Sequence, residues 1–139
     1  MTGTRIIQRA LLAAVLSSGS SAMAQTASVE LKGSSEVPAN PSAASGKGSI
    51  SVAADKSVSG SISTTGIEGR VAHIHTGAAG ANGPVIVPLA KDGDNGWTVP
   101  AGAKLTDEQY AAYVAGTLYV NVHSATYPGG EIRGQLSPK

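Results

Sequence analysis

The sequence predicts an all-β domain, a sandwich or a barrel, with one short helix. Apolar and polar residues alternate over about eight short segments, and turn residues separate these segments at close spacing. The chain of 139 residues has no Phe, one Trp and four Tyr, so its core must consist mainly of Val, Ile, Leu and Ala, of which the β-branched ones favour strands. Residues 25–139 suffice for one such core and are too few for two.

The first 24 residues have the features of an export signal peptide. Arg5 and Arg9 give a basic start, residues 10–16 are uninterruptedly apolar, and residues 22–24 (AMA) offer the small side chains that a signal peptidase accepts. The apolar run is shorter than the roughly 20 residues that a membrane span needs. We therefore expect cleavage near Ala24 and a periplasmic or secreted domain, residues 25–139, with no membrane anchor after cleavage.

The first half of this domain alternates between strands and turns. A loop with two prolines is expected at residues 36–44, and a glycine-rich loop at residues 77–83. Strands are expected at residues 27–31, 48–53, 57–64, 71–75 and 85–89.

The second half contains the helix. Thr106 can cap it, with Gln109 three residues on, and Gly116 closes it, so the helix is expected to extend through Tyr113. A turn is expected before it, at residues 91–96 (KDGDNG). The remaining strands are expected at residues 97–99, 118–123 and 131–136.

Charge and cysteine content exclude several functions. After removal of Arg5 and Arg9, eight Lys and Arg remain against nine Asp and Glu, and they are scattered along the chain. Nucleic acids and anionic membranes require clustered basic residues and are therefore not expected as partners. The absence of cysteine excludes thiolate catalysis, iron–sulfur clusters and thiolate–zinc sites.

All three histidines of the chain fall on the less apolar faces of two predicted strands. Side chains alternate along a strand, so His73 and His75 share a face. In the strand at residues 118–123, His123 lies opposite the apolar set. That set comprises Leu118, Val120 and Val122, and the face of His123 also carries Tyr119 and Asn121.

The pattern indicates a candidate metal site. Two histidines spaced His-x-His can chelate one ion, and His123 from a neighbouring strand would complete a three-nitrogen set that leaves a fourth position open for water. Imidazole ligands suit copper or zinc, and the affinity order of divalent ions favours copper. The alternative is that these histidines bond only to neighbouring backbone or carboxylate groups, or lie exposed. A separation above about 10 Å would rule out one shared ion, whose bonds measure about 2 Å.

Three other residues are candidates for positions beside the ligands. Glu131 and Arg133 share a face, where Glu131 could accept the free ring N–H of a ligand histidine or form an exposed ion pair with Arg133. Tyr127 could lie beside the metal or pack with its hydroxyl in water.

Several motifs together resemble the CHRD domain, named after chordin and also found in bacterial exported proteins. They are residues 31–38 (LKGSSEVP), 72–75 (AHIH), 82–85 (NGPV), 118–123 (LYVNVH) and 127–135 (YPGGEIRGQ), and the resemblance extends from Val29 to Leu136. It implies a Greek-key or immunoglobulin-like β-sandwich.

The histidine-bearing strands are also similar to the copper half of the Cu/Zn superoxide dismutase sandwich. By that likeness His73, His75 and His123 would be copper ligands, whereas the residues for a zinc subsite and the family's disulfide are missing. Our leading hypothesis is therefore an exported copper-binding domain for metal handling or redox chemistry. The alternatives are a metal-free module that binds an envelope protein or polymer through residues 36–44 and 77–83, and a copper-only dismutase-like enzyme.

Overall fold

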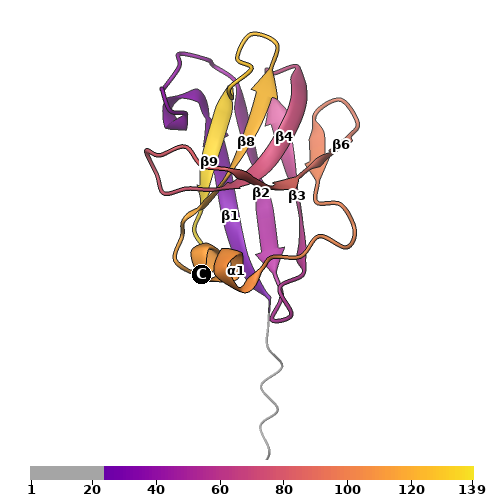
Figure 1. Cartoon of the computed structure of the whole chain (residues 1–139). Helices are drawn as coiled ribbons and strands as arrows, with labels where there is room; N and C mark the ends of the chain where they lie inside the picture. The colour runs from indigo at the N-terminus through magenta and orange to yellow at the C-terminus, as the bar shows by residue number, and fades with distance from the viewer. Residues whose placement is uncertain (1–23) are drawn as a thin grey trace, which may run out of the picture.

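The computed structural model describes residues 24–139, which form an antiparallel β-structure with one short α-helix (Figure 1). The expected signal peptide lies outside the described residues, except for Ala24. None of the helices within residues 24–139 is long and apolar enough to cross a membrane. The strands are β1 (Gln25–Lys32), β2 (Ser45–Val52), β3 (Val58–Thr65), β4 (Gly69–Thr76), β5 (Val85–Pro88), β6 (Ala90–Asp92), β7 (Gly96–Thr98), β8 (Leu118–Ser124) and β9 (Ile132–Leu136).

The strands follow the order β5-β4-β8-β9-β1-β2-β3-β7-β6. Between β9 and β1 the ladder is reduced to the pair Lys32 and Arg133, so the sheet bends there. At the opposite side, the Leu89 N–H donates to the Ala72 carbonyl at 2.9 Å and β6 then pairs with β7, so the β5–β6 segment links the two ends. The result is a barrel-like β-sandwich, and the predicted all-β fold with one short helix is confirmed.

The core lies between the two halves of the bent sheet, β5-β4-β8-β9 and β1-β2-β3-β7-β6. It consists mainly of every second residue along the strands. In β1 the inward residues Ala27, Val29 and Leu31 are almost fully buried and alternate with exposed ones, as the sequence predicts, whereas nearly every residue of β8 is buried. Most of the core is aliphatic, and it also contains the indole ring of Trp97. Its largest aliphatic members are Leu31, Ile50, Ile62, Ile74, Leu118, Ile132 and Leu136.

Helix α1 (Asp107–Val114) begins as the sequence predicts. The Thr106 hydroxyl accepts from the Gln109 N–H at 3.1 Å, and the Gln109 side chain accepts from the Thr106 N–H at 2.9 Å. The fully buried Tyr113 donates its hydroxyl to the Gln25 carbonyl at 2.7 Å, which ties the helix to the start of β1. Figure 1 shows α1 at the end of the sandwich where β1 begins and the chain terminates.

The prediction of a turn over residues 91–96 is wrong in its extent. Strands β6 and β7 pair from Ala90 with Thr98 to Asp92 with Gly96, which leaves a turn of only three residues. All three residues of β6 are exposed, so the strand has no buried alternate positions. Alternation could not reveal it, because backbone pairing with β7 is what makes it a strand.

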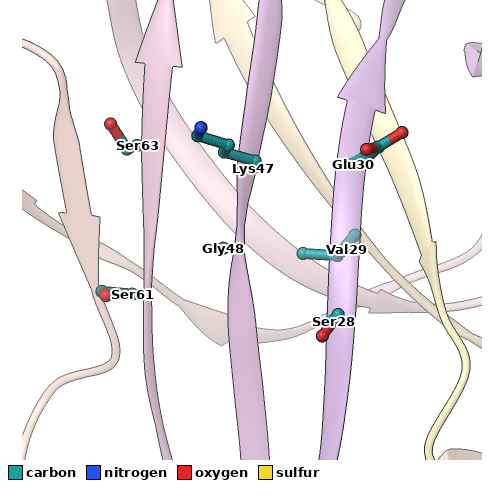
Figure 2. A pocket seen from close by; sticks show the side chains of 7 residues that line it. All are labelled: Ser28, Val29, Glu30, Lys47, Gly48, Ser61 and Ser63. Atoms are coloured by element: carbon teal, nitrogen blue, oxygen red, sulfur yellow. The ribbon is translucent and has the colours of Figure 1, made fainter.

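The outward-facing sides of the two sheets differ. On β1–β3, outward side chains remain exposed and line a shallow hollow (Figure 2). We call this surface the open face; its residues include Ser28, Glu30, Lys47, Ser49, Ser61 and Ser63. On β4, β8 and β9, the outward side chains are covered by three segments, residues 33–44, 77–84 and 127–130. We call this surface the covered face; it comprises His73, His75, Tyr119, Asn121, His123 and Arg133.

Candidate functional site

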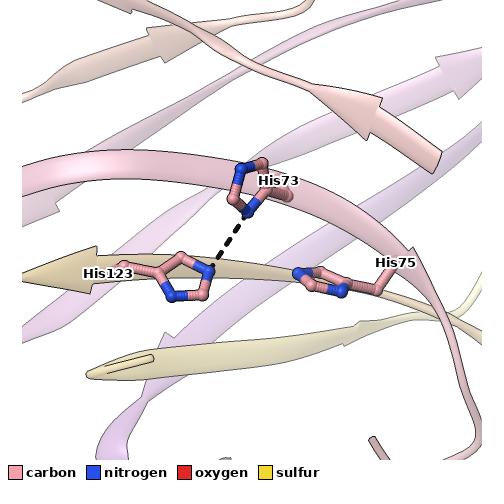
Figure 3. A group of neighbouring side chains, drawn as sticks. All are labelled: His73, His75 and His123. Carbon is pink, nitrogen blue, oxygen red and sulfur yellow. Dashed lines mark hydrogen bonds between the residues drawn. The ribbon is translucent and has the colours of Figure 1, made fainter. Parts of the chain in front are cut away.

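Strands β4 and β8 bring the three histidines into one cluster. The two strands are antiparallel neighbours. His73 is paired with Asn121, and the pairs of His75 with Tyr119 and of His123 with Val71 lie two positions away in either direction, so all three histidines share one face. One ring nitrogen from each histidine lies within 4.8 Å of the others. Figure 3 shows the three rings turned toward a common point. These separations lie well inside the limit of about 10 Å beyond which one shared ion would be ruled out.

Backbone carbonyls fix the orientation of two of these rings. Nδ1 of His75 lies 2.9 Å from the Gly83 carbonyl, and Nδ1 of His123 lies 2.9 Å from the Pro128 carbonyl. A carbonyl oxygen can only accept, so both Nδ1 atoms must carry the proton. In the neutral ring, Nε2 of each histidine then carries no proton, and its lone pair can bind a metal ion.

The Gly83 carbonyl can take this position only because residue 83 is glycine. A Cβ at this position would lie 1.6 Å from the Thr76 carbonyl oxygen, since the loop folds directly against the end of β4. The glycine-rich loop expected at residues 77–83 turns at Ala79-Gly80. Gly83 follows this turn and supplies the hydrogen-bond partner of His75.

The ring of His73 lies against the ring of His123. Nδ1 of His73 is 3.2 Å from Nε2 of His123, with the ring centroids 5.0 Å apart. Burial lowers the pKa of His73 below its ordinary value, and the neighbouring charges of His123 and His75 lower it further. Burial also lowers the pKa of His123, although the hydrogen bond to Pro128 acts against this. Both effects favour the neutral rings that a metal requires.

Asn121 lies at the centre of the cluster and was not among the predicted site residues. Its Oδ1 is 2.8 Å from Nε2 of His75 and 2.9 Å from Nε2 of His123. Asn121 is only 3 % exposed. The sequence contained the signal, because Asn121 shares a strand face with His123, but an amide is a less obvious ligand than an imidazole.

Arg133 is linked to the cluster through the ring of Tyr119. Its guanidinium stacks 3.5 Å from the Tyr119 ring centre, and the same ring stacks on His75 at 4.7 Å. Because two groups cannot share one side of a ring, His75 and Arg133 sandwich Tyr119 between them. Arg133 also donates to the carbonyls of Ala78 and Ala81 and thereby holds the glycine-rich loop over the site.

Glu36 is a second buried residue that sequence reasoning missed. It is 6 % exposed, and its Oε1 is the one buried side-chain oxygen or nitrogen within residues 24–139 that lacks a hydrogen-bond partner. Burial raises the pKa of Glu36 above its ordinary value, while the Arg133 charge and the Asn121 amide moderate that rise. Its place in the proline-containing loop gave no sign of burial.

The other two candidate neighbours lie away from the ligand atoms. The Glu131 carboxylate accepts hydrogen bonds from the hydroxyls of Ser42 and Ser124, both at 2.6 Å, and not from a histidine. Tyr127 is half-buried, and its carbonyl accepts from the Gly130 N–H at 3.0 Å. The turn closed by this hydrogen bond contains Pro128, whose carbonyl bonds to His123. The backbone of Tyr127 therefore lies near the site.

The comparisons with known proteins assign the chain to a family. A search of curated proteins and a search of solved structures each found no match to this chain. The family model described as the CHRD domain matches residues 27–136, which includes all three histidines and both residues, Asn121 and Glu36, that accompany them. The resemblance seen in the sequence is thereby confirmed, and the chain belongs to the CHRD domain family.

Proposed function

We propose that this domain binds a copper ion through His73, His75 and His123 and serves metal handling or redox chemistry outside the cytoplasm. The observation that carries the proposal is the fixed protonation of two rings. Because the carbonyls of Gly83 and Pro128 hold the protons on Nδ1, Nε2 of His75 and Nε2 of His123 face the centre of the cluster as lone pairs.

A purely structural hydrogen-bond network accounts poorly for this arrangement. Asn121 Oδ1 is itself an acceptor, yet it lies within 2.9 Å of both Nε2 atoms. With His75 and His123 neutral, Asn121 Oδ1 faces two unprotonated Nε2 atoms. A proton on Nδ1 of His73 can be donated to Nε2 of His123 at 3.2 Å, but it leaves Oδ1 and Nε2 of His75 facing each other as two acceptors, which is unfavourable in a buried site. A positive ion at that point would satisfy all of them, and it would also accept Nδ1 of His73 as a third nitrogen ligand.

Copper fits this donor set better than other common ions. Three imidazoles suit copper and zinc, whereas calcium and magnesium prefer all-oxygen sites. Of the two, copper has the higher affinity for a given nitrogen site at equal availability. The proposed location outside the cytoplasm, which follows from the expected signal peptide, would also remove competition from cytosolic thiols.

The proposal is tested by titrating the mature domain with Cu(II) and Zn(II) by equilibrium dialysis. We expect one copper ion per chain, with weaker zinc binding. His73→Ala and His123→Ala should each lose most of the affinity, because two remaining imidazoles chelate poorly. Arg70→Ala, an exposed position on the same strand as His73, is the matched control and should bind copper normally.

Unchanged copper binding in both histidine variants would contradict the proposal. It would favour a metal-free module that binds an envelope protein or polymer through residues 36–44 and 77–83. Under that function, pull-down of the partner from an envelope extract should survive replacement of all three histidines.

A further inference from the structure

The three nitrogen atoms are accompanied by one oxygen atom at ligand distance. In a four-coordinate site with bonds of about 2.0 Å, neighbouring ligand atoms lie roughly 2.8 Å apart in the square plane that Cu(II) prefers and roughly 3.3 Å apart in a tetrahedron. Asn121 Oδ1 lies 2.8 and 2.9 Å from the Nε2 atoms of His75 and His123, and the two closest nitrogens lie 3.2 Å apart. Both separations from the oxygen are close to the square-planar value, so the oxygen is placed as an equatorial ligand of Cu(II) would be.

The surroundings of Asn121 fix which end of its amide faces the histidines. A Cβ built on Gly130 would lie 2.7 Å from Asn121 Nδ2, 2.6 Å from Glu36 Oε1 and 2.7 Å from Glu36 Oε2, so the amide nitrogen and the carboxyl lie together under this glycine. A carboxyl attracts the N–H₂ end of the amide and repels the carbonyl end. Glu36 therefore holds Oδ1 toward the cluster.

Gly130 is needed for this arrangement on two grounds. Its φ of 127° lies in a region that disfavours other residues, and any side chain would enter the space between Glu36 and Asn121. Glycine thus allows the buried carboxyl to approach the amide from behind. Glu36 acts on the site through Asn121, as a positioning residue rather than a ligand.

We propose that Asn121 Oδ1 is the fourth ligand, which completes a set of three nitrogens and one oxygen and leaves no equatorial position for water. This inference rests on the proposed copper site and replaces the open fourth position expected from the sequence. An amide oxygen is a hard donor, and the described residues contain no Cys or Met to supply a soft one. The complete set therefore selects Cu(II) over Cu(I).

Electron paramagnetic resonance of the Cu(II)-loaded domain in water enriched in oxygen-17 tests the fourth ligand directly. Water bound in the equatorial plane broadens the copper lines, so the wild type should show no broadening, whereas Asn121→Ala should show it. Cu(II) affinity should fall about 10- to 100-fold in Asn121→Ala. Cu(I) affinity, measured under reducing conditions with a competing chelator, should change less than about threefold, because the soft ion gains little from oxygen.

Two further variants guard against indirect effects. Asn121→Asp keeps Oδ1 and should bind Cu(II) without water broadening. Asn95→Ala removes an exposed amide in the turn between β6 and β7, away from the cluster, and should leave the spectrum unchanged. If Asn121→Ala does not fold, the wild-type and Asn121→Asp spectra still decide the question.

The outcomes separate this inference from the proposed function. A wild type that binds no copper overturns both. A wild type that binds copper through the histidines but already shows water broadening overturns the fourth ligand alone, as does an Asn121→Ala variant with unaltered Cu(II) affinity and spectrum.

Discussion

The open face and the covered face begin from the same sequence pattern and end as different surfaces. Both lie on antiparallel strands in which every second residue enters the core, and both carry mainly polar side chains on the outward positions. On the open face Ser61 and Ser63 are exposed to solvent, whereas on the covered face Asn121 and Arg133 are 3 % and 1 % exposed. Alternation therefore identifies an outward face, and the loops decide whether it becomes solvent surface or a site.

Burial places a condition on the covered face that the open face does not have. An exposed serine can bond to water, but a buried amide or guanidinium must find partners in the protein. Arg133 finds them in three acceptors of the glycine-rich loop. The polar atoms of the covered face are consequently held in single orientations, which is what a metal site requires of its ligands.

The largest effect should come from replacing the arginine that holds the cover in place. We expect Arg133→Met to lower the free energy of unfolding by about 3 kcal/mol, because Ala78, Ala81 and Asn82 lose their donor and the stacking on Tyr119 disappears. Urea denaturation of the metal-free protein measures this. Lys47→Met, the matched change on the open face, should alter stability by less than about 0.5 kcal/mol. Equal losses in the two variants would show that the faces do not differ in this respect.

A smaller effect is expected from displacing the carbonyl that orients His75. Gly83→Ala places a Cβ against the Thr76 carbonyl and must shift the loop, so copper affinity should fall about 10-fold or more. Gly80→Ala is the matched control in the same loop: its φ of 83° makes it strained, but its Cβ would meet no atom within 4 Å. It should lower stability slightly and leave copper affinity as it is. Loss of affinity in both variants would mean that general loosening of the loop, not the His75 contact, matters.

The metal-free protein should become less stable as the pH falls through the ordinary histidine value of 6.5. His73 and His123 have lowered pKa values in the folded state, so the unfolded chain binds more protons and unfolding is favoured as the pH decreases. Urea denaturation from about pH 7.5 to 5 in the presence of a chelator measures the slope. His73→Gln should flatten it.

Glu36 acts in the opposite direction over the lower part of this range. Its raised pKa means that the folded protein binds the proton more readily, so protonation of Glu36 stabilises the fold as the pH falls. Glu36→Gln should therefore steepen the histidine-dependent loss. A slope that is unchanged in both variants would show that neither group titrates differently on folding.

Much of the fold and the histidine set could be predicted because both depend on local patterns. Period-two alternation gave most strands and put His73 and His75 on one face, and Thr106 with Gln109 gave the helix start. Strand β6 was missed because pairing, not alternation, defines it. Asn121 and Glu36 were missed because their roles depend on which strands are neighbours and on how the loop at Glu36 folds back, and both are non-local.

The smallest effect should be a gain in stability on the open face. Ser61 is exposed in the middle of β3 and is paired with Ser49 on one side and Thr98 on the other. Threonine favours strands more than serine does, and its methyl group can contact both cross-strand neighbours, so Ser61→Thr should raise the free energy of unfolding by a few tenths of a kcal/mol. Copper affinity should not change. A substitution that improves the open face but weakens copper binding would show that the two faces are coupled through the core, contrary to their separate roles.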